Sequence, residues 1–212
     1  MKALMMGAAG LLSADYGPGP NQLVGGDRNS GYFGLMTTDK LVTPATLAQL
    51  VGLTAGTAFN GTAPWFKFID NGKILYVASK PLRYGISQIN LDQLSLRTGK
   101  EVTFLDRRFK VRCLSGGNAN PSTASGGEWD RLMYRMSGNS PQGVVRFAAY
   151  DDAQLGINGS LNGRATYCQE TDKNTNYPVI RGHGGITSYG GGNNIGSNAS
   201  VFGWRPVLEL IP

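Results

Sequence analysis

The sequence has very few of the residues that build metal and thiol sites. It contains two cysteines, Cys113 and Cys168, and one histidine, His183, among 212 residues. A zinc site needs several Cys or His ligands at short spacing, and the two cysteines form no CxxC pair. The EF-hand calcium pattern and the Gly-Lys-Ser/Thr ending of a phosphate-binding loop are missing as well. We therefore expect no metal ion and no cofactor.

The two cysteines permit one disulfide but do not require it. Cys113 stands in a segment typical of a strand, and Cys168 in one typical of a loop. Because free cysteine is commonly buried in protein cores, we expect two free, buried thiols. A disulfide between them stays open as the alternative.

Charged residues are also scarce, at 16% of the chain against ~25% in average soluble domains. The net charge is +6, yet a nucleic-acid-binding protein concentrates such charge in one run or on one face. The only dense basic stretch is RRFKVR, with Arg107, Arg108, Lys110 and Arg112 spaced as on a strand. We interpret it as a solvated strand face and expect no nucleic acid partner.

A long apolar run is missing too. No stretch reaches the ~20 apolar residues of a membrane-spanning helix, so we expect no membrane insertion. The N-terminal MKALMMGAAGLLSA is similar to a signal peptide, but it carries a single charge and no clear cleavage site. We predict that residues 1–30 form an extended docking arm that bends at GPGP, and that residues 31–212 form one globular domain.

The sequence shows no motif of nucleophilic catalysis. There is no G-x-S-x-G, and His183 lies between glycines in RGHGG, where we expect a loop residue without a ligand role. The visible carboxylate pair, Asp151 and Asp152, is typical of a turn. A Ser-His-Asp or Cys-His site can still assemble from distant positions, and so can the carboxylate pair of a carbohydrate-active hydrolase. We predict that the protein is not an enzyme and keep the hydrolase as the distant alternative.

Several segments carry clear signals of regular structure, which together predict an α+β fold. Thr43, Pro44 and Gly52 mark the two ends of a helix, and Ser87 precedes a second helix. The Asn-Gly step at 71–72 suits a type I′ turn between two apolar strands. The expected elements are a strand over 31–36, a helix over 44–51, a hairpin over 64–79, a helix after 87, a hairpin over 101–114 turning near 106–107, a helix over 128–136 and a strand over 144–150.

Glycine, asparagine and tyrosine are frequent in residues 156–200. The whole sequence has 31 glycines, about twice the usual share. Large residues interrupt this stretch, so we expect long irregular loops packed on the domain rather than a flexible linker. Tyr, Ser, Gly and Asn form adaptable contact surfaces, and these loops are predicted to meet either a ligand or sister subunits. The candidate contacts, here and near the N-terminus, are Tyr16, Tyr32, Phe33, Tyr167, Tyr177, His183 and Tyr189.

The last twelve residues, VFGWRPVLELIP, have the composition of a core strand. In a strand, Val207 and Glu209 face one side, and Leu208 and Leu210 the other. Pro206 cannot donate a ladder hydrogen bond, so we expect the strand to start at an edge or a bulge. We predict that this strand closes the sheet and pairs near the first strand.

Six stretches resemble virion structural proteins of tailed bacteriophages, in the same order along the chain. They are GYFGLMTTDKL, LVGLTAGTAFN, PWFKFIDNGKILYVASKPLRYGIS, FKVRCLSGG, EWDRLMYRM and FGWRPVLELIP, and they cover roughly 31–136 and 201–212. The resemblance implies a structural component of the virion, made in the host cytoplasm, with other virion proteins and sister subunits as partners. It also implies a tail- or fibre-associated role that involves a host surface glycan or receptor. Capsid decoration or a collar or neck role is the alternative.

The terminal Gly203-Trp204-Arg205-Pro206 is similar to the closing strand of C-type-lectin-like domains, including their formylglycine-generating-enzyme branch. This similarity implies joined N- and C-terminal strands, antiparallel hairpins, two or three short helices and long irregular loops. The Glu-Pro-Asn and Trp-Asn-Asp signatures of calcium-dependent lectins are missing. No motif matches Cys113 or Cys168 to the paired cysteines of the enzyme branch, so neither calcium-dependent sugar binding nor catalysis is carried over.

Overall fold

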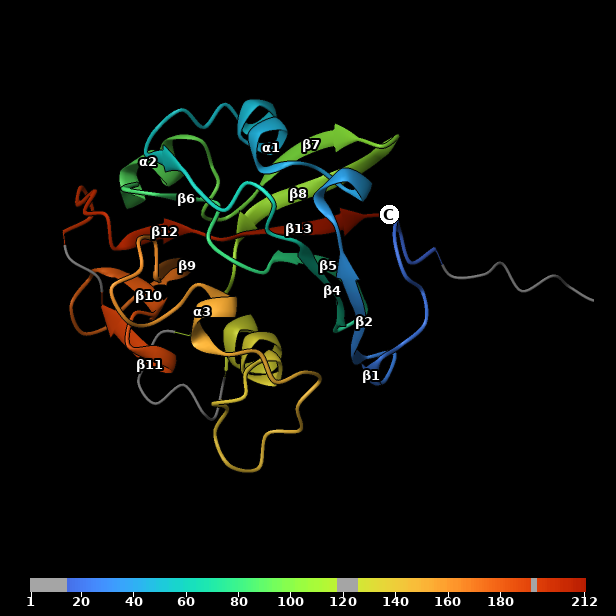
Figure 1. The fold of residues 1–212 in the computed structure, drawn as a ribbon. Coiled ribbons are helices and arrows are strands. Elements are labelled where there is room, and N and C mark those ends of the chain that lie inside the picture. The colour runs from blue at the N-terminus through green and yellow to red at the C-terminus, as the bar shows by residue number, and fades with distance from the viewer. Residues whose placement is uncertain (1–14, 118–125, 192–193) are drawn as a thin grey trace, which may run out of the picture.

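The computed structural model describes residues 15–117, 126–191 and 194–212, which form two sheets and a few short helices (Figure 1). The mixed α+β class expected from the sequence is confirmed. Within these residues the larger sheet has seven strands, and all of its neighbours pair antiparallel. In spatial order they are β1 (Gly25–Gly26), β2 (Ser30–Met36), β4 (Trp65–Asp70), β5 (Lys73–Ala78), β13 (Pro206–Ile211), β8 (Arg107–Cys113) and β7 (Lys100–Phe104).

The smaller sheet has six strands in the described part of the chain. β12 pairs parallel with β9, and the other neighbours pair antiparallel. In spatial order they are β11 (Gly185–Gly191), β10 (Pro178–Gly182), β9 (Ala165–Thr171), β12 (Phe202–Trp204), β6 (Arg83–Tyr84) and β3 (Thr57–Ala58).

The terminal strand β13 lies in the middle of the seven-stranded sheet, between β5 and β8. The prediction that it pairs near the first strand is wrong, because β4 and β5 separate it from β2. The expected edge or bulge at Pro206 is also wrong, because β13 is a central strand and its pairing with β8 is regular. Pro206 is the first residue of β13, and the ladder to β5 begins only at Val207. The expected alternation is confirmed, since Val207 and Leu208 belong to different hydrophobic clusters.

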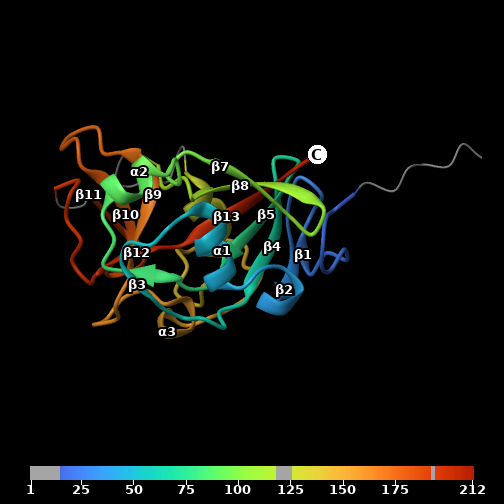
Figure 2. The ribbon, with the colours of Figure 1, turned by 90° about the horizontal axis from the view of Figure 1, so that it is seen from above.

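Arg205 alone separates β12 from β13, so the chain passes from the smaller sheet into the larger one at this residue (Figure 2). Its side chain is buried and donates to the carbonyl oxygens of Ala78 and Ser79, where β5 ends. It also donates to the carbonyl of Leu155, at the end of the short helix α3 (Asp152–Leu155). The guanidinium group thus satisfies backbone acceptors at the junction of the two sheets.

The two helices with clear capping signals are confirmed. α1 (Pro44–Val51) follows Thr43, whose hydroxyl accepts from a backbone amide of the first turn, and ends at Gly52. α2 (Gln88–Gln93) follows Ser87, which forms a reciprocal capping box. A short 3-10 turn, η1 (Thr38–Lys40), precedes α1. No helix among the described residues is long and apolar enough to cross a membrane.

Both predicted hairpins are present in the seven-stranded sheet. β4 and β5 turn at Asn71 and Gly72, whose φ angles of 50° and 76° match the expected type I′ turn. β7 and β8 turn at Leu105 and Asp106, with φ angles of 51° and 54°. This second turn lies one residue before its expected position.

The segments expected as a helix over 128–136 and a strand over 144–150 differ from the prediction. The first is helical but irregular, with a π-helical turn η2 (Trp129–Met133) followed by a 3-10 turn η3 (Tyr134–Met136). The strand prediction is wrong. The amides of Phe147 and Ala148 both donate to the carbonyl of Arg135, so the chain bends back onto η3 instead of extending beside another strand.

Regular strands occupy much of 156–200, where we expected irregular loops. β9, β10 and β11 lie within this stretch and pair with one another as an antiparallel meander. Tyr167, Ile180 and Ile186 are buried. These three large residues therefore mark inward-facing strand positions in the glycine-rich sequence.

Hydrophobic clusters cover both faces of the seven-stranded sheet. One cluster brings Leu47 of α1 and Leu91 of α2 together with Leu208 of β13. The other brings Trp129 of η2 together with Val207. Successive residues of β13 therefore bury their side chains in opposite clusters, as expected for a strand covered on both faces.

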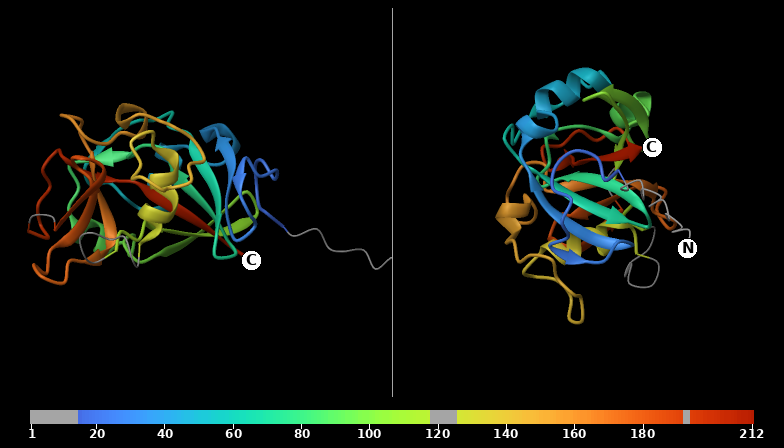
Figure 3. Two further views of the ribbon diagram at one scale, coloured as in Figure 1. Left: turned by 90° about the horizontal axis from the view of Figure 1, so that it is seen from below. Right: turned by 90° about the vertical axis from the view of Figure 1, so that its right-hand side faces the viewer.

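Residues 15–24 lie against the seven-stranded sheet (Figure 3, right). The buried ammonium group of Lys67 in β4 donates to the carbonyl of Pro20 at 2.8 Å and to Oδ1 of Asn21 at 2.9 Å. The described part of the predicted arm is therefore packed on the domain. Residues 1–14 lie outside the described residues, and the docking role of the arm stays a prediction.

Candidate functional site

Three of the predicted contact residues belong to the hydrophobic core. Tyr32, Phe33 and Tyr167 are 4%, 1% and 0% exposed. Their rings pack against other core rings, as Tyr167 does on Phe202 at 5.3 Å between ring centroids. A ring buried in this way cannot touch a partner unless the fold opens. These three side chains therefore belong to the core and not to a contact surface.

Tyr177 and Tyr189 share a hydrogen-bond partner, Asp172, in the turn between β9 and β10. Asp172 closes this turn, because its carboxylate accepts from two backbone amides of the turn at 2.9 Å. The Tyr189 hydroxyl donates to the same carboxylate at 2.5 Å, and the Asp172 amide donates to the carbonyl of Tyr177 at 2.8 Å. Tyr177 itself is 44% exposed. The turn, residues 172–177, therefore presents an exposed aromatic ring on a hydrogen-bonded base.

The hydrogen bond between Asp172 and Tyr189 shifts the pKa values of both groups, and Arg181 lies next to it. The hydrogen bond from Tyr189 is the main cause that holds the pKa of Asp172 below its usual value. Burial, and then the hydrogen bond to Asp172, raise the pKa of Tyr189. The buried guanidinium of Arg181 lies 5.7 Å from the Tyr189 ring and pairs with Asp130 at 2.6 Å.

The other two candidates lie apart from the 172–177 turn. His183 is exposed between β10 and β11, at the opposite end of these strands. Tyr16 lies in the N-terminal segment, where its ring is 5.5 Å from Phe33 and its hydroxyl accepts from Arg28. The predicted contacts thus do not form one site.

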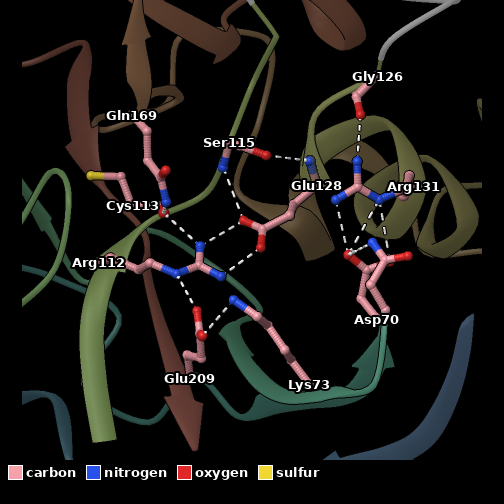
Figure 4. Close-up of polar contacts among 11 residues, drawn as sticks. Asp70, Lys73, Arg112, Cys113, Ser115, Gly126, Glu128, Arg131, Gln169 and Glu209 are labelled. Atoms are coloured by element: carbon pink, nitrogen blue, oxygen red, sulfur yellow. Dashed lines mark hydrogen bonds and ion pairs between the residues drawn. The ribbon is translucent and has the colours of Figure 1, made fainter. Parts of the chain in front are cut away.

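Charged side chains from two strands and from the start of η2 surround Arg112 of β8 (Figure 4). Its guanidinium group donates to Glu128 through two hydrogen bonds of 2.6 and 2.5 Å, and to Glu209 of β13 at 2.9 Å. Glu209 also pairs with Lys73 of β5 at 2.7 Å. The Ser115 amide donates to Glu128 at 3.0 Å. We call these five residues the Arg112 network.

Pairing favours the charged forms of Arg112 and Glu209 in spite of their burial. Burial opposes the charged form of Arg112, but Glu128 and Glu209 outweigh it and raise its pKa. Burial also acts to raise the pKa of Glu209, yet the hydrogen bonds from Lys73 and Arg112 lower it below its usual value. Mutual pairing of this kind holds strands in place. Arg112 is 5% exposed, so the prediction of a solvated strand face is wrong at this residue.

Sequence reasoning missed this network, although each strand carries a signal for it. Arg112 and Glu209 are single charges between apolar neighbours in KVRCL and VLELI. Opposite charges at such positions indicate a buried pair, because an unpaired buried charge is costly. The missing information is that β8 and β13 are neighbours in the sheet.

A second ion pair joins η2 to the hairpin of β4 and β5 (Figure 4). Arg131 donates to Oδ2 of Asp70 from Nη2 at 2.9 Å and from Nε at 3.2 Å. The hydrogen bond to Asp70 is the main cause that raises the pKa of Arg131. The start of the irregular helix is thus fixed at the end of β4.

Two hollows lie beside the pair formed by Lys73 and Glu209. The apolar hollow, of about 500 Å³, lies between Asp15, Arg107 and the aliphatic end of β13. The polar hollow, of about 220 Å³, adjoins the Arg112 network. Its carboxylates already accept hydrogen bonds from Arg112 and Lys73, so they are poorly placed to act as general bases. It is lined by Lys73, Thr98, Lys110, Arg112, Ser115, Glu128, Gln169 and Glu209.

Both cysteines are free and buried, as predicted. Cys168 lies in β9, not in a loop. Its backbone forms an isolated parallel β-bridge with Leu114, which follows β8 of the other sheet. Because neighbours along a strand point to opposite sides, the thiols of Cys113 and Cys168 point apart. Burial raises the pKa of Cys113 to about 12 and raises that of Cys168 as well. Such thiols are inert rather than nucleophilic.

Comparison of the chain with protein families, with curated proteins and with solved structures found no match. Within the described ranges, no group of three or more His, Cys, Asp or Glu side chains is arranged to hold a metal ion. The 172–177 turn offers a contact surface, and the Arg112 network joins strands.

Proposed function

We propose that the chain is a non-enzymatic structural component of a tailed-bacteriophage virion, tail- or fibre-associated, that acts in particle assembly and in attachment to the host surface. The resemblance behind this proposal covers roughly 31–136 and 201–212, which supply most of the seven-stranded sheet. The residues between these two stretches supply β9, β10 and β11. In this proposal the larger sheet is the scaffold and the smaller sheet carries the contact surface.

The observation that carries the attachment role is the 172–177 turn. Tyr177 is exposed, while Asp172 and Tyr189 hold the backbone beneath it by hydrogen bonds. A tyrosine on a preorganised turn offers a large contact area at low cost in conformational entropy. Its proposed partner is a glycan or receptor of the host surface.

We further propose that the domain is C-type-lectin-like. The antiparallel hairpins, the short helices α1 and α2, and the closing strand after Gly203 support this proposal. The position of β13, which β4 and β5 separate from β2, departs from the joined terminal strands that the resemblance implies.

The attachment role predicts that the purified protein binds cells of the host bacterium through Tyr177. We expect Tyr177→Ala to weaken cell binding without changing thermal melting, because the ring is exposed. Val145→Ala, on a different exposed loop, is the control and should bind like the wild type. Equal binding by Tyr177→Ala and the wild type, or no binding at micromolar protein, would contradict this role.

Capsid decoration, or a collar or neck role, is the competing proposal, and the N-terminal segment favours it. Asp15 pairs with Arg107 and Lys67 holds the residues that follow, so the chain up to residue 14 joins the domain at a fixed point. Such an anchor suits an arm that docks on a neighbouring virion protein or a sister subunit. Removal of residues 1–14 leaves the contacts of Lys67 in place and should abolish incorporation into assembled particles. Unchanged incorporation would refute arm docking.

A further inference from the structure

The polar hollow next to the Arg112 network has side chains of both charges on one face of the seven-stranded sheet. Glu209 lies directly opposite Lys110 in the ladder between β13 and β8. Arg112 lies two residues further along β8 and therefore faces the same side. Lys73 of β5 reaches this side too, since it pairs with Glu209.

The two carboxylates that face this hollow already accept hydrogen bonds. The two carboxylate oxygens of Glu209 accept from Lys73 at 2.7 Å and from Arg112 at 2.9 Å. The two oxygens of Glu128 accept from Arg112, and one of them also accepts from the Ser115 amide. A ligand that donates hydrogen bonds would have to compete with these charge-assisted bonds.

The ammonium groups of Lys110 and Lys73, in contrast, still have N–H groups available to donate hydrogen bonds. In the described part of the chain the ammonium group of Lys110 makes no hydrogen bond or ion pair, although it carries three N–H groups. Lys73 uses one carboxylate partner, and its side chain is 59% exposed. Thr98, which carries a hydroxyl group, also lines the hollow.

The stem of Lys110 passes close to the backbone of Gly99. A Cβ at Gly99 would lie 1.9 Å from Cε of Lys110, so a larger residue there would push the lysine side chain aside. The φ angle of Gly99 is +137°, which L side chains rarely adopt. Glycine at this position thus leaves room for the lysine stem beside the hollow.

We propose that the polar hollow binds a tetrahedral oxyanion, a phosphate or sulfate group, between the ammonium groups of Lys73 and Lys110 and the hydroxyl of Thr98. Such a group is an acceptor on all sides and complements the open donors, and lysine is a common phosphate ligand that acts as a point charge. The hollow of about 220 Å³ accommodates one such group. This binding would occur independently of the proposed attachment surface.

The proposal is tested by titrating the ¹⁵N-labelled full chain with sodium phosphate at constant ionic strength. We expect saturable shifts of the backbone amides of Thr98, Lys110 and Ser115. Lys110→Gln keeps the stem and removes the charge, and should raise the Kd by about tenfold. Lys173→Gln removes an exposed lysine of the 172–177 turn and should leave the Kd unchanged. Thr98→Val is a second variant in case Lys110→Gln does not fold, and it should also weaken binding.

Parallel titrations with sodium sulfate and with glucose 6-phosphate distinguish the source of the group. Tighter binding of the sugar phosphate than of inorganic phosphate indicates a group carried on a larger molecule. Equal binding indicates recognition of the free ion, and both results support the site. Shifts that grow linearly without saturation, or equal affinity in Lys110→Gln and the wild type, would overturn the proposal.

Discussion

Three of the buried cationic side chains are stabilised in different ways. Arg112 is held by two carboxylates, whereas Arg205 donates to backbone carbonyls, and Lys67 to backbone carbonyls and an Asn side chain. Carbonyl oxygens carry no net charge and replace lost hydration only in part. Burial therefore lowers the pKa of Arg205 and of Lys67, while the pKa of Arg112 is raised.

We expect the Lys67 ammonium group to titrate with a pKa of about 8, well below its usual value of 10.5. Between these two values the unfolded chain binds more protons than the folded protein, so the free energy of unfolding should rise with pH in this window. NMR titration of the lysine Cε resonances measures the pKa directly. A Lys67 pKa near 10.5 would show that its ammonium group is not buried among carbonyl oxygens.

At the scale of elements, the best sequence signals are those of turns and caps. The residue pair Asn71 and Gly72 forms a turn in which both φ angles are positive, a conformation that glycine adopts without strain. Thr43 and Ser87 cap their helices by side-chain hydrogen bonds. These features depend on neighbours within a few residues.

The hairpin turn gives a prediction with a matched control. A Cβ added at Gly72 or at Gly61 meets no atom within 4 Å, but only Gly72 has a positive φ, of +76°. Gly72→Ala should therefore lower the free energy of unfolding by about 1–2 kcal/mol, through backbone strain alone. Gly61→Ala should change it by less than about 0.5 kcal/mol. Urea denaturation measures both, and equal losses would argue against the type I′ turn.

Long-range pairing is the part of the fold that the sequence did not reveal. VVRFAAY has the apolar composition of a strand, but residues 144–150 find hydrogen-bond partners in η3 instead of in a sheet. Conversely, glycine and asparagine concealed the alternation of β9, β10 and β11. Of the candidate contacts, Tyr177 and Tyr189 both hydrogen-bond to Asp172, a link that depends on the pairing of β10 with β11 and could not be read from the sequence. The Arg112 network depends on strand order and could not be located in advance.

At the scale of the molecule, β13 is the centre of the fold. It pairs with β5 and β8, and its two faces bury residues in both hydrophobic clusters. Arg205 at its start donates to Ala78, 127 residues away in the sequence. Contacts of this range must form against a large loss of chain entropy, so we expect folding on the millisecond-to-second scale typical of sheet proteins.

Removal of residues 207–212 should therefore abolish folding instead of trimming a tail. The deletion separates β5 from β8 and leaves Arg112 without Glu209. Circular dichroism and thermal melting should show loss of the cooperative transition. Removal of the exposed Pro212 alone, which lies outside β13, is the control and should melt like the wild type. A protein without 207–212 that melts unchanged would refute the central position of β13.

The single-residue junction at Arg205 has a consequence for protein engineering. Since β12 continues directly into β13, neither sheet is a module that can be excised and expressed by itself. The 172–177 turn closes on its own Asp172, but a graft of the turn onto another hairpin would also need a donor in the place of Tyr189. A larger graft that includes β9 and β12 would have to include β13 and the seven-stranded sheet as well, because Arg205 joins β12 to β13.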